Sequence, residues 1–211
     1  MGDDGELYVA AEVVPIYKSI IPSADIILPN QFEAELLSSC TIDSLESVSK
    51  CLERLHQIYR VAHIVISSVR LGSHPDFIFC CGSTATSCLR PRAFFLAAPI
   101  IDGPFVGTGD LFAALLLIQL HRYRDRLVPH DHIPAEDVPL AKALEWVIAS
   151  MQGVLKNTKL YMDREEAKYR DVQSQSERER HVQNMRAAEL RLVRSQDALL
   201  RPQITVRAAR L

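Results

Sequence analysis

The sequence lacks most of the features that mark specialised classes of protein. Its five cysteines are an odd number and none stands in a Cys-x-x-Cys pair, so neither a disulfide framework nor a structural zinc site is favoured. The longest apolar run, residues 111–120, is about half the ~20 residues that a membrane-spanning helix needs. The first residues also lack the basic and apolar regions of a signal peptide. We therefore expect a cytoplasmic protein that does not associate with a membrane.

An excess of charge of one sign is also missing. The 211 residues include 24 Lys and Arg against 26 Asp and Glu, a formal net charge of -2. Binding to nucleic acid or to an anionic membrane by charge alone would require a basic surplus. Hydrophobic residues make up 48% and charged residues 24%, which is the balance of a globular protein. Function must therefore be sought in local motifs, and we expect no nucleic-acid partner.

The first third of the chain alternates between helical and strand patterns. Apolar residues recur at helical spacing over 13–21, and the short apolar run 24–28 is typical of a buried parallel strand. A helix is expected to begin at Asn30, a second to cover 43–58, and a strand to follow over 61–68. This strand–helix–helix–strand order predicts an α/β fold with a parallel sheet and helical crossovers.

Later segments extend this pattern. Residues 76–82 and 92–100 predict two further strands, which we expect to be antiparallel at the sheet edge. The run 111–118 is apolar almost all round and predicts a helix buried in the middle of the domain. A helix is expected over 140–155 and a last strand over 204–206.

The segment 163–194 alternates acidic and basic residues. It is compatible with a solvated helix held by pairs three or four residues apart, such as Glu166 with Arg170. It is equally compatible with a partly disordered insertion. No regular heptad is visible, so a coiled coil is not favoured.

The strongest local motif is Gly107-Thr108-Gly109-Asp110, which stands directly before the apolar helix. Glycines let backbone N–H groups approach an anion closely, and the positive end of the helix dipole points the same way. Such a loop can hold a phosphate during phosphoryl transfer, and Asp110 could accept a proton from an attacking hydroxyl. The alternative is a glycine turn followed by an Asp that simply favours a helix N-terminus.

A second pair, Asn30 and Glu33, follows the strand that ends at Leu28. Ligands of open α/β sheets bind at the carboxyl ends of parallel strands, and a carboxylate there could hold a magnesium-bound water. Asn at the N-cap with Glu three residues later is also a capping box, and by spacing alone the cap is favoured. The same spacing recurs at Asp43 and Glu46, before the second helix.

Three weaker signals remain. The stretch 2–9 gathers carboxylates among glycines and could meet a metal–nucleotide complex, or it is a frayed terminus. Ser67 and Ser68 end a strand and could contact phosphate, or only end the strand. The cluster 130–132, His-Asp-His, lacks a third well-placed ligand and is expected to be a surface loop.

Three segments together carry a resemblance to a known family. Residues 2–9, 24–37 and 105–114 occur in the order found in the pyridoxal kinases of the ribokinase-like superfamily, which the chain resembles closely. The run Pro-Asn-Gln-Phe-Glu-Ala-Glu-Leu-Leu within 24–37 is specific to the pyridoxal kinases, whereas Gly-Thr-Gly-Asp is shared across the superfamily. Residues 189–196 also resemble the end of that family, while 161–181 resemble it poorly.

The resemblance implies an α/β fold, namely a ribokinase-like three-layer α/β/α sandwich that is incomplete at the N-terminus. The family's earlier strands, which supply the vitamin-binding Ser, Thr and Tyr residues, have no counterpart here. We expect three parts: residues 1–160 as the C-terminal part of the kinase domain, 161–187 as a charged insertion, and 188–211 as a return to the kinase domain. We also expect a bare strand edge, exposed apolar surface and an inactive isolated chain.

Roles for individual residues follow from the same resemblance. Asp110 matches the catalytic base for the 5′-hydroxyl of pyridoxal, pyridoxine or pyridoxamine, and so also a substrate contact. Asp3 and Glu33 match metal-associated acids. Leu28 departs from the Thr found in some members of the family. The residues that match ATP-binding positions are Tyr8, Asn30, Gln31, Phe32, Glu33, Ser67, Ser68, Ile101, Asp102, Gly103, Gly107, Thr108 and Gly109.

The implied function is ATP-dependent phosphorylation of B6 vitamers, as in vitamin B6 salvage. ATP and Mg²⁺ are the expected cofactors, with a monovalent cation as a further candidate, and ATP and a B6 vitamer are the expected partners. A homodimer is expected of the full-length enzyme. Two alternatives stay open: another ribokinase-like kinase such as a hydroxymethylpyrimidine kinase, and a non-catalytic nucleotide-binding protein that meets a partner through 163–194.

Overall fold

The structure is a computed structural model that describes residues 2–3, 6–123, 131–169 and 177–211. The chain divides into two compact units. The first, here called the sheet unit, comprises Met1–Pro99, Leu120–Glu145 and Val206–Leu211, and the second, the helical unit, comprises Ile100–Gln119 and Trp146–Thr205.

The sheet unit is built on a five-stranded sheet. Its strand order is β3-β4-β5-β6-β7, in which β3 runs parallel to β4 and every other neighbouring pair is antiparallel. The predicted parallel pairing of the first two strands and the antiparallel direction of the next two are therefore confirmed. Their predicted place at the sheet edge is wrong, because β5 is the middle strand and β6 is paired on both sides. The strands are β3 (Ile26–Ile27), β4 (His63–Arg70), β5 (Phe77–Ala85), β6 (Pro91–Pro99) and β7 (Ala209–Arg210).

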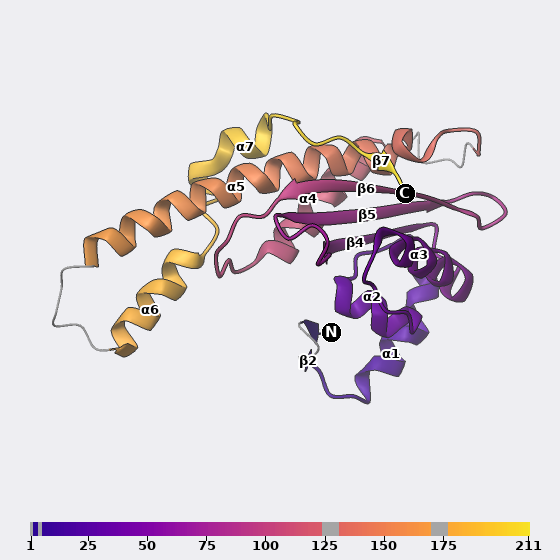
Figure 1. Cartoon of the computed structure of the whole chain (residues 1–211), viewed down its shortest axis with the longest axis horizontal. Coiled ribbons are helices and arrows are strands. Elements are labelled where there is room, and N and C mark those ends of the chain that lie inside the picture. The colour runs from indigo at the N-terminus through magenta and orange to yellow at the C-terminus, as the bar shows by residue number, and fades with distance from the viewer. Residues whose placement is uncertain (1, 4–5, 124–130, 170–176) are drawn as a thin grey trace. The chain divides into compact units, whose positions relative to one another are not determined.

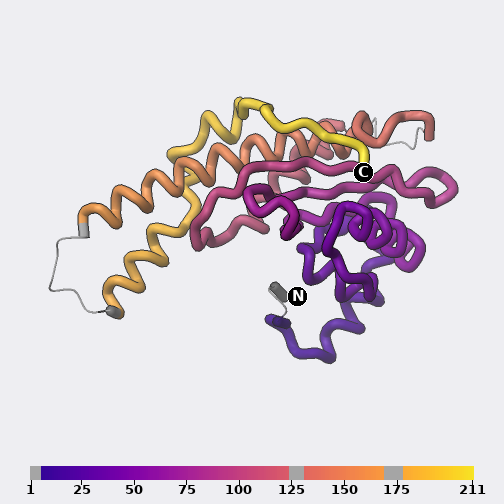
Figure 2. Tube along the Cα trace, in the orientation of Figure 1, coloured from indigo at the N-terminus to yellow at the C-terminus, as the bar shows by residue number. Residues whose placement is uncertain are grey.

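The last strand lies elsewhere than predicted. Residues 204–206 pair with no described strand of the sheet, whereas β7 pairs with β6. The backbone N–H of Ala208 donates to the carboxylate of Glu145 at 3.1 Å, so the tail meets the open edge of β6 only beyond Ala208. Figure 2 shows the chain ending beside this strand. A β-branched triplet favours extended backbone, but the partner decides where the ladder forms.

Two helices of the sheet unit, α2 and α3, pack against each other and against its strands. The α3 helix contacts β4, β5 and β6, and α2 contacts both α3 and β4 (Figure 1). A small antiparallel pair of strands, β1 and β2, precedes them, and β1 contacts α2. The bounds are β1 (Gly2–Asp3), β2 (Glu6–Leu7), α1 (Val13–Ile20), η1 (Ile21–Ser23), α2 (Gln31–Ser38), α3 (Leu45–Tyr59) and η3 (Ala135–Asp137).

The core of the sheet unit lies between α3 and the strands. Val48, Leu52 and Leu55 of α3 are fully buried, as are Ile64 and Ile66 of β4. Each such side chain stabilises the fold by roughly 1.5–3 kcal/mol relative to an exposed one. The spacing of three and four residues that predicted this helix therefore marks the face that it buries.

The predicted capping box of α3 is wrong by one residue. The N-cap is Ser44, whose hydroxyl accepts from the N–H of Ser47 at 3.2 Å, and the Ser47 hydroxyl accepts in return from Ser44 N at 3.0 Å. Glu46 instead lies in the first turn and pairs with Lys50 at 2.7 Å. Asp and Ser are both favourable N-cap residues. Ser44 is the N-cap because it directly precedes the first helical residue and has extended backbone.

One edge of the sheet is uncovered in the part of the chain that the structure describes. No described strand pairs with the outer side of β3, and Ile26 and Ile27 are half-buried instead of covered on both faces. Helix α1 buries no residue, with Ile16 61% and Ile20 57% exposed. The expectation of a bare edge and exposed apolar surface is confirmed for these residues, whereas full burial of 24–28 is wrong.

The helical unit consists of helices and the loops between them. Its elements are α4 (Thr108–Arg122), α5 (Pro139–Tyr169), α6 (Glu177–Ala188), η4 (Val193–Ser195) and α7 (Gln196–Leu200), and α4 and α5 both cross the division between the units. Glycine at 153 allows α7 to approach α5, because a Cβ there would lie 2.5 Å from the Cβ of Ala198. None of the described helices is both long and apolar enough to cross a membrane.

The charged segment is helical where the structure describes it. Helix α5 continues beyond the expected 140–155, and α6 begins at Glu177. Ion pairs one turn apart line this extension, including Lys159 with Asp163 at 3.0 Å. The solvated-helix alternative is therefore confirmed for 163–169 and 177–188. The proposed partner of Glu166, Arg170, lies outside the described residues.

Helix α4 departs from the expected burial. Leu117 is 70% exposed and Ile118 is 51% exposed, while Phe112, Leu115 and Leu116 on the other side are buried. The prediction of a helix buried all round is therefore wrong. Apolar residues on every side permit complete burial but do not produce it unless neighbouring segments surround the helix.

Candidate active site

The sheet unit places Asn30 and Glu33 at the start of α2, directly after β3. The side-chain oxygen of Asn30 accepts from the N–H of Glu33 at 2.8 Å, and Oε2 of Glu33 accepts from the N–H of Asn30 at 3.0 Å. This is a complete capping box, as the spacing indicates. It fixes both side chains at the positive end of a helix, where anions are also stabilised.

A metal ion at the start of α2 would have few protein ligands among the described residues. An ionised carboxylate has about four lone-pair sites, so the cap at Glu33 is compatible with a magnesium-bound water. Asp3 lies on β1, which contacts α2, but its side chain is outside what the structure describes. The described residues contain no cluster of three or more metal-ligating side chains. Among the described side chains, Glu33 is thus the one carboxylate at this end of α2 that could meet such a cation.

Ser67 and Ser68 form a β-bulge within β4 and do not end the strand as expected, because Val69 and Arg70 continue its pairing with β5. Ile66 lies opposite Cys81 and Val69 opposite Phe79, so two serines on β4 face one residue on β5. Bulges re-aim side chains and are common beside active sites. The placement of the two serines inside the strand therefore follows from the pairing of β4 with β5.

The bulge is held against the start of α2. Ser67 donates from its N–H to the carbonyl of Pro29 at 2.9 Å, and its hydroxyl reaches the same carbonyl at 3.5 Å. Pro29 immediately precedes the N-cap Asn30. The structure therefore brings Asn30, Glu33 and the two serines to one end of the β3–β4 pair, as expected for parallel strands.

Gln31 has a structural role that the sequence did not reveal. Its amide N–H donates to the carbonyl of Ile42 at 2.9 Å, and its amide oxygen accepts from the N–H of Arg70 at 2.9 Å. It thereby ties α2 to the end of β4 and to the loop before α3. Phe32 beside it is half-buried, and Tyr8, which follows β2, is 75% exposed.

The glycine loop lies in the helical unit and leads into α4. Gly107 adopts φ +83°, a left-handed conformation that favours glycine, and its carbonyl accepts from Leu111 N at 3.1 Å. The N–H groups of Thr108, Gly109 and Asp110 therefore lie in the first helical turn, where no intrahelical acceptor exists.

The space beside the two glycines of this loop is open. A Cβ added at Gly107 or Gly109 would meet no atom of the described residues within 4 Å. The preceding residue Val106 anchors the loop, because its N–H donates to the carbonyl of Ala188 at 3.2 Å and it forms a bridge with Glu189. An anion could therefore approach the backbone N–H groups closely without displacing a side chain.

The other predicted site residues of the helical unit flank the glycine loop in the sequence. Asp110 is exposed in the first turn of α4. Asp102 and Gly103 are also exposed, and Ile101 is half-buried. A Cβ at Gly103 would lie 2.8 Å from the Phe105 ring, so only glycine fits beneath that ring without a shift.

The cluster at 130–132 does not form a metal site among the described residues. His130 lies outside them, and Asp131 accepts hydrogen bonds from the N–H of Ser87 at 3.0 Å and from its hydroxyl. Asp131 thus fastens the turn between β5 and β6.

Sequence reasoning missed the bulge and the bridging role of Gln31. The bulge had a visible signal, since two serines interrupt the apolar run Ile64-Val65-Ile66 and Val69 resumes it two residues later. The contacts of Gln31 had no visible signal in the sequence, because its partners lie 11 and 39 residues away in the chain.

Comparison with known proteins connects these features to one family. The family model described as phosphomethylpyrimidine kinase matches residues 2–126. A putative pyridoxal kinase of Schizosaccharomyces pombe is 36% identical over 207 residues, covering 95% of this chain and 58% of that protein. Pyridoxal kinase of Arabidopsis thaliana is 31% identical over 212 residues, covering 100% of this chain and 59% of that protein.

Solved structures give the same result for the fold. The crystal structure of Plasmodium falciparum PdxK with AMP-PNP and PL superposes with a TM-score of 0.74 at 26% identity, covering 100% of this chain and 58% of that one. The chain thus spans less than two thirds of the length of these relatives. The predicted ribokinase-like fold class is confirmed. Since the family model matches more than half of the sequence, the chain belongs to the phosphomethylpyrimidine kinase family, within the ribokinase-like superfamily that also includes the pyridoxal kinases.

Proposed function

We propose that this protein serves ATP-dependent phosphorylation of the 5′-hydroxyl of pyridoxal, pyridoxine or pyridoxamine. The observation that carries the proposal is the open glycine loop at the start of α4, with Gly107 at φ +83° and Asp110 exposed in the first turn. Family membership and relatives named as pyridoxal kinases support it. The structure of Plasmodium falciparum PdxK contains a nucleotide analogue and PL, which supports the same pair of substrates here.

In this proposal Asp110 is the general base. Its carboxylate takes the proton of the vitamin hydroxyl as the oxygen attacks the γ-phosphorus of ATP, and ADP leaves in line. The N–H groups of Thr108, Gly109 and Asp110, together with the positive end of the α4 dipole, stabilise the charge on the transferred phosphoryl group. Because these donors are fixed by the helix, no reorganisation is needed during the reaction.

Asn30 and Glu33 are proposed to face the nucleotide phosphates from the start of α2. Glu33, with Asp3, would hold Mg²⁺ through water, and the ion would supply neutralisation of phosphate charge. Ser67 and Ser68 would donate to phosphate oxygens from the bulge. The further proposed nucleotide contacts are Tyr8, Gln31, Phe32, Ile101, Asp102 and Gly103.

The proposal also covers the activity of the isolated chain, its domain organisation, its location and its oligomeric state. The chain spans 58% of the S. pombe relative, and we propose that it is inactive when expressed alone. Residues 161–187 are proposed to be an insertion relative to the kinase domain. We further propose a cytoplasmic location and homodimerisation of the complete enzyme.

Two measurements test the function. Titration calorimetry with AMP-PNP and Mg²⁺ on the purified chain tests the nucleotide site, with the Gly107→Val variant as the comparison because valine strains the backbone at φ +83°. Phosphorylation is then assayed in a chimaera that joins to this chain the part of the S. pombe relative outside the matched region. Saturable AMP-PNP binding that Gly107→Val abolishes, with vitamer phosphorylation by the chimaera, is the expected outcome. Absence of nucleotide binding in a folded chain would contradict the proposal.

A second candidate function is phosphorylation of a hydroxymethylpyrimidine. The description of the matching family model, phosphomethylpyrimidine kinase, favours it. A substrate panel on the chimaera, with three B6 vitamers beside hydroxymethylpyrimidine, separates the two kinases by kcat/KM. Nucleotide binding without turnover of any substrate would instead indicate a non-catalytic binding protein.

A further inference from the structure

Two hydrogen bonds flank the serine bulge on the side of β4 that faces β3. The N–H of Ser67 donates to the carbonyl of Pro29 at 2.9 Å. The N–H of Arg70 donates to Oε1 of Gln31, also at 2.9 Å. Pro29 and Gln31 are the two sequence neighbours of Asn30, the N-cap of α2. The bulge is therefore joined to the start of α2 immediately before and immediately after Asn30.

The bond to Gln31 follows from the extra residue in the strand. Every second N–H of a strand faces the same neighbour, and on β4 those of His63 and Ser67 donate to the segment that contains β3. This alternation would next bring the N–H of Val69 to that side. Because the bulge adds one residue, the N–H of Arg70 takes its place. Beyond the end of β3, the amide oxygen of Gln31 supplies the acceptor for it.

The hydrophobic core shows the same shift by one residue. Ile64, Ile66 and Val69 are fully buried and belong to one cluster with α3. Side chains on one face of a regular strand are two residues apart, so Val69 shares this face with Ile66 only because of the bulge. Burial of Val69 thus stabilises the bulge from the core, and the bond to Gln31 stabilises it from the edge.

The side chain of Gln31 is itself held by a second bond. Its amide N–H donates to the carbonyl of Ile42 at 2.9 Å. The N–H of Ile42 donates in turn to Oε1 of Glu35, one turn later on α2, at 2.7 Å. Ile42 is 4% exposed, so both side chains of α2 bond to a buried segment. The orientation of the Gln31 amide follows from its partners, because its nitrogen meets a carbonyl and its oxygen meets an N–H.

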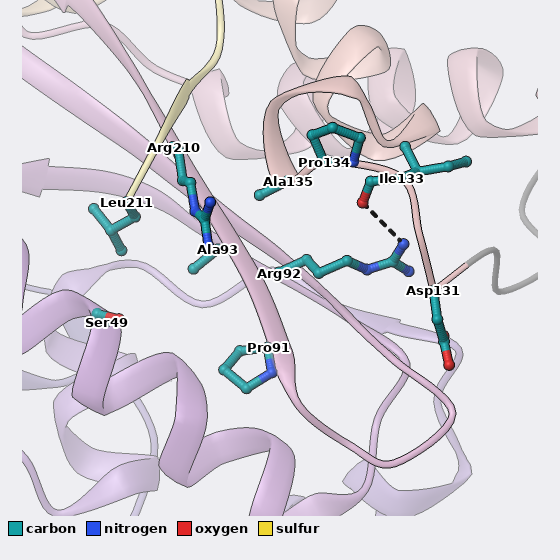
Figure 3. A pocket seen from close by; sticks show the side chains of 10 residues that line it. All are labelled: Ser49, Pro91, Arg92, Ala93, Asp131, Ile133, Pro134, Ala135, Arg210 and Leu211. Carbon is teal, nitrogen blue, oxygen red and sulfur yellow. Dashed lines mark hydrogen bonds between the residues drawn. The ribbon is translucent and has the colours of Figure 1, made fainter.

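The pocket shown in Figure 3 lies at the other end of β4. Its volume is about 260 Å³, and Arg92 is one of the residues that line it. Arg92 pairs with Thr84, and Thr84 pairs with His63, the first residue of β4. Neither the bulge nor α2 contributes a residue to its walls. The placement of the two serines therefore depends on backbone contacts and not on the walls of this pocket.

We propose that Gln31 is a positioning residue of the nucleotide site, which fixes the edge of the bulge and thereby the direction of the Ser67 and Ser68 hydroxyls. This role rests on the proposed function, in which both serines donate to phosphate oxygens, and it refines the contact proposed there for Gln31. Its amide nitrogen and oxygen are both bonded to backbone groups. The effect of Gln31 on the nucleotide is therefore expected to pass through the serines.

Gln31→Met tests the proposal, because methionine has a similar length but no amide. The matched control is Glu35→Met, which breaks the other bond between α2 and Ile42 and leaves Arg70 bonded. We expect both variants to melt at a lower temperature than the wild type. Only Gln31→Met should speed hydrogen exchange at the Arg70 amide, by about fivefold, and weaken AMP-PNP binding by a similar factor.

A double-mutant cycle separates positioning from direct contact with the nucleotide. Ser67→Ala together with Ser68→Ala removes both hydroxyls. Adding Gln31→Met to that variant should weaken AMP-PNP binding by less than about twofold further, because a residue that acts through the serines has little effect once they are gone. A full fivefold further loss would show that Gln31 acts independently of the serines and would overturn the proposal.

Binding by the wild-type chain separates this role from the proposed function. Absence of AMP-PNP binding in the folded wild type would overturn the proposed function and, with it, the role of Gln31 at the nucleotide site. Wild-type binding that Gln31→Met leaves unchanged would overturn only the role of Gln31. Equal exchange rates of the Arg70 amide in wild type and Gln31→Met, or an equal loss of affinity in Glu35→Met, would do the same.

Discussion

Glu145 and Arg207 form an ion pair of 2.7 Å, although 62 residues separate them in the sequence. The carboxylate side chain is 3% exposed, whereas the arginine side chain is 68% exposed. The same carboxylate accepts from the N–H of Ala208 at 3.1 Å and lies 3.4 Å from Nζ of Lys142. One buried acid on α5 therefore fastens the last residues of the chain to the sheet unit.

The first prediction concerns this acid. Glu145→Ala leaves the N–H of Ala208 without its acceptor and releases the tail before β7, so the free energy of unfolding should fall by roughly 2–3 kcal/mol. Glu145→Gln keeps an acceptor for Ala208 and should cost less. Urea unfolding of both variants measures the effect, with the exposed Glu53→Gln as the control. A loss below about 0.5 kcal/mol for Glu145→Ala would show that the tail is held by other contacts.

The second prediction concerns Asp110 and applies to the active chimaera. Asp110→Asn keeps the size of the side chain but removes the base, so kcat should fall by about 10²–10⁴-fold with little change in ATP affinity. Steady-state kinetics beside AMP-PNP titration separate the two quantities. Unchanged kcat would leave Asp110 as a residue that only favours the start of α4.

The third prediction separates the two roles of Glu33. Glu33→Gln still offers an oxygen to the N–H of Asn30, so the capping box should survive and stability should change by well under ~2 kcal/mol. If the carboxylate serves Mg²⁺, AMP-PNP binding should weaken in the presence of Mg²⁺ and remain unchanged without it. Calorimetry with and without the ion, beside a thermal melt, makes the comparison. Equal affinities in wild type and variant under both conditions would remove Glu33 from the metal site.

The fourth prediction concerns the contribution of His56 to the loss of folding stability at acidic pH. This ring is fully buried, with Nδ1–H donating to the carbonyl of Val61 at 2.8 Å and Nε2 accepting from the Ser83 hydroxyl at 2.9 Å. Burial lowers its pKa in the folded protein. As pH falls below about 6.5, His56 becomes protonated in the unfolded chain but stays neutral in the folded chain. Stability should therefore be complete above that pH and decline below it.

A variant isolates this contribution from those of other groups. His56→Gln has no titrating ring, so its free energy of unfolding should fall less steeply than that of wild type between pH 7 and pH 5. Urea unfolding at four pH values gives both slopes. Parallel slopes would mean that the His56 pKa does not differ between the folded and unfolded states.

The fifth prediction concerns the contact of α5 with α7. Gly153→Ala places a Cβ 2.5 Å from that of Ala198, so the helices must separate and stability should fall by about 1–3 kcal/mol, despite the better helix propensity of alanine. The double variant Gly153→Ala, Ala198→Gly restores the space and should recover part of the loss. Gly72→Ala, where an added Cβ meets nothing within 4 Å, is the control. A neutral Gly153→Ala would show that α7 shifts freely.

Local chemistry determined several features that could be predicted from the sequence. The apolar spacing of α3, the capping box of Asn30 and Glu33, and the glycine turn before Asp110 each depend on residues within a few positions of one another. Helical periodicity and side-chain capping are short-range effects, and φ > 0 is available mainly to glycine. The family resemblance also depended on these short, continuous motifs.

Tertiary structure decided the features that depend on contacts between residues distant in the sequence. The Ser67–Ser68 bulge exists because β5 offers one residue against two, and β7 begins at Ala209, directly after the residue whose N–H is bonded to Glu145. Leu117 is exposed although its helix is apolar on every side. In each case the local sequence allows more than one arrangement of similar free energy. The choice is made by hydrogen bonds and burial between segments that meet only in the folded chain, and local propensity contains no information about them.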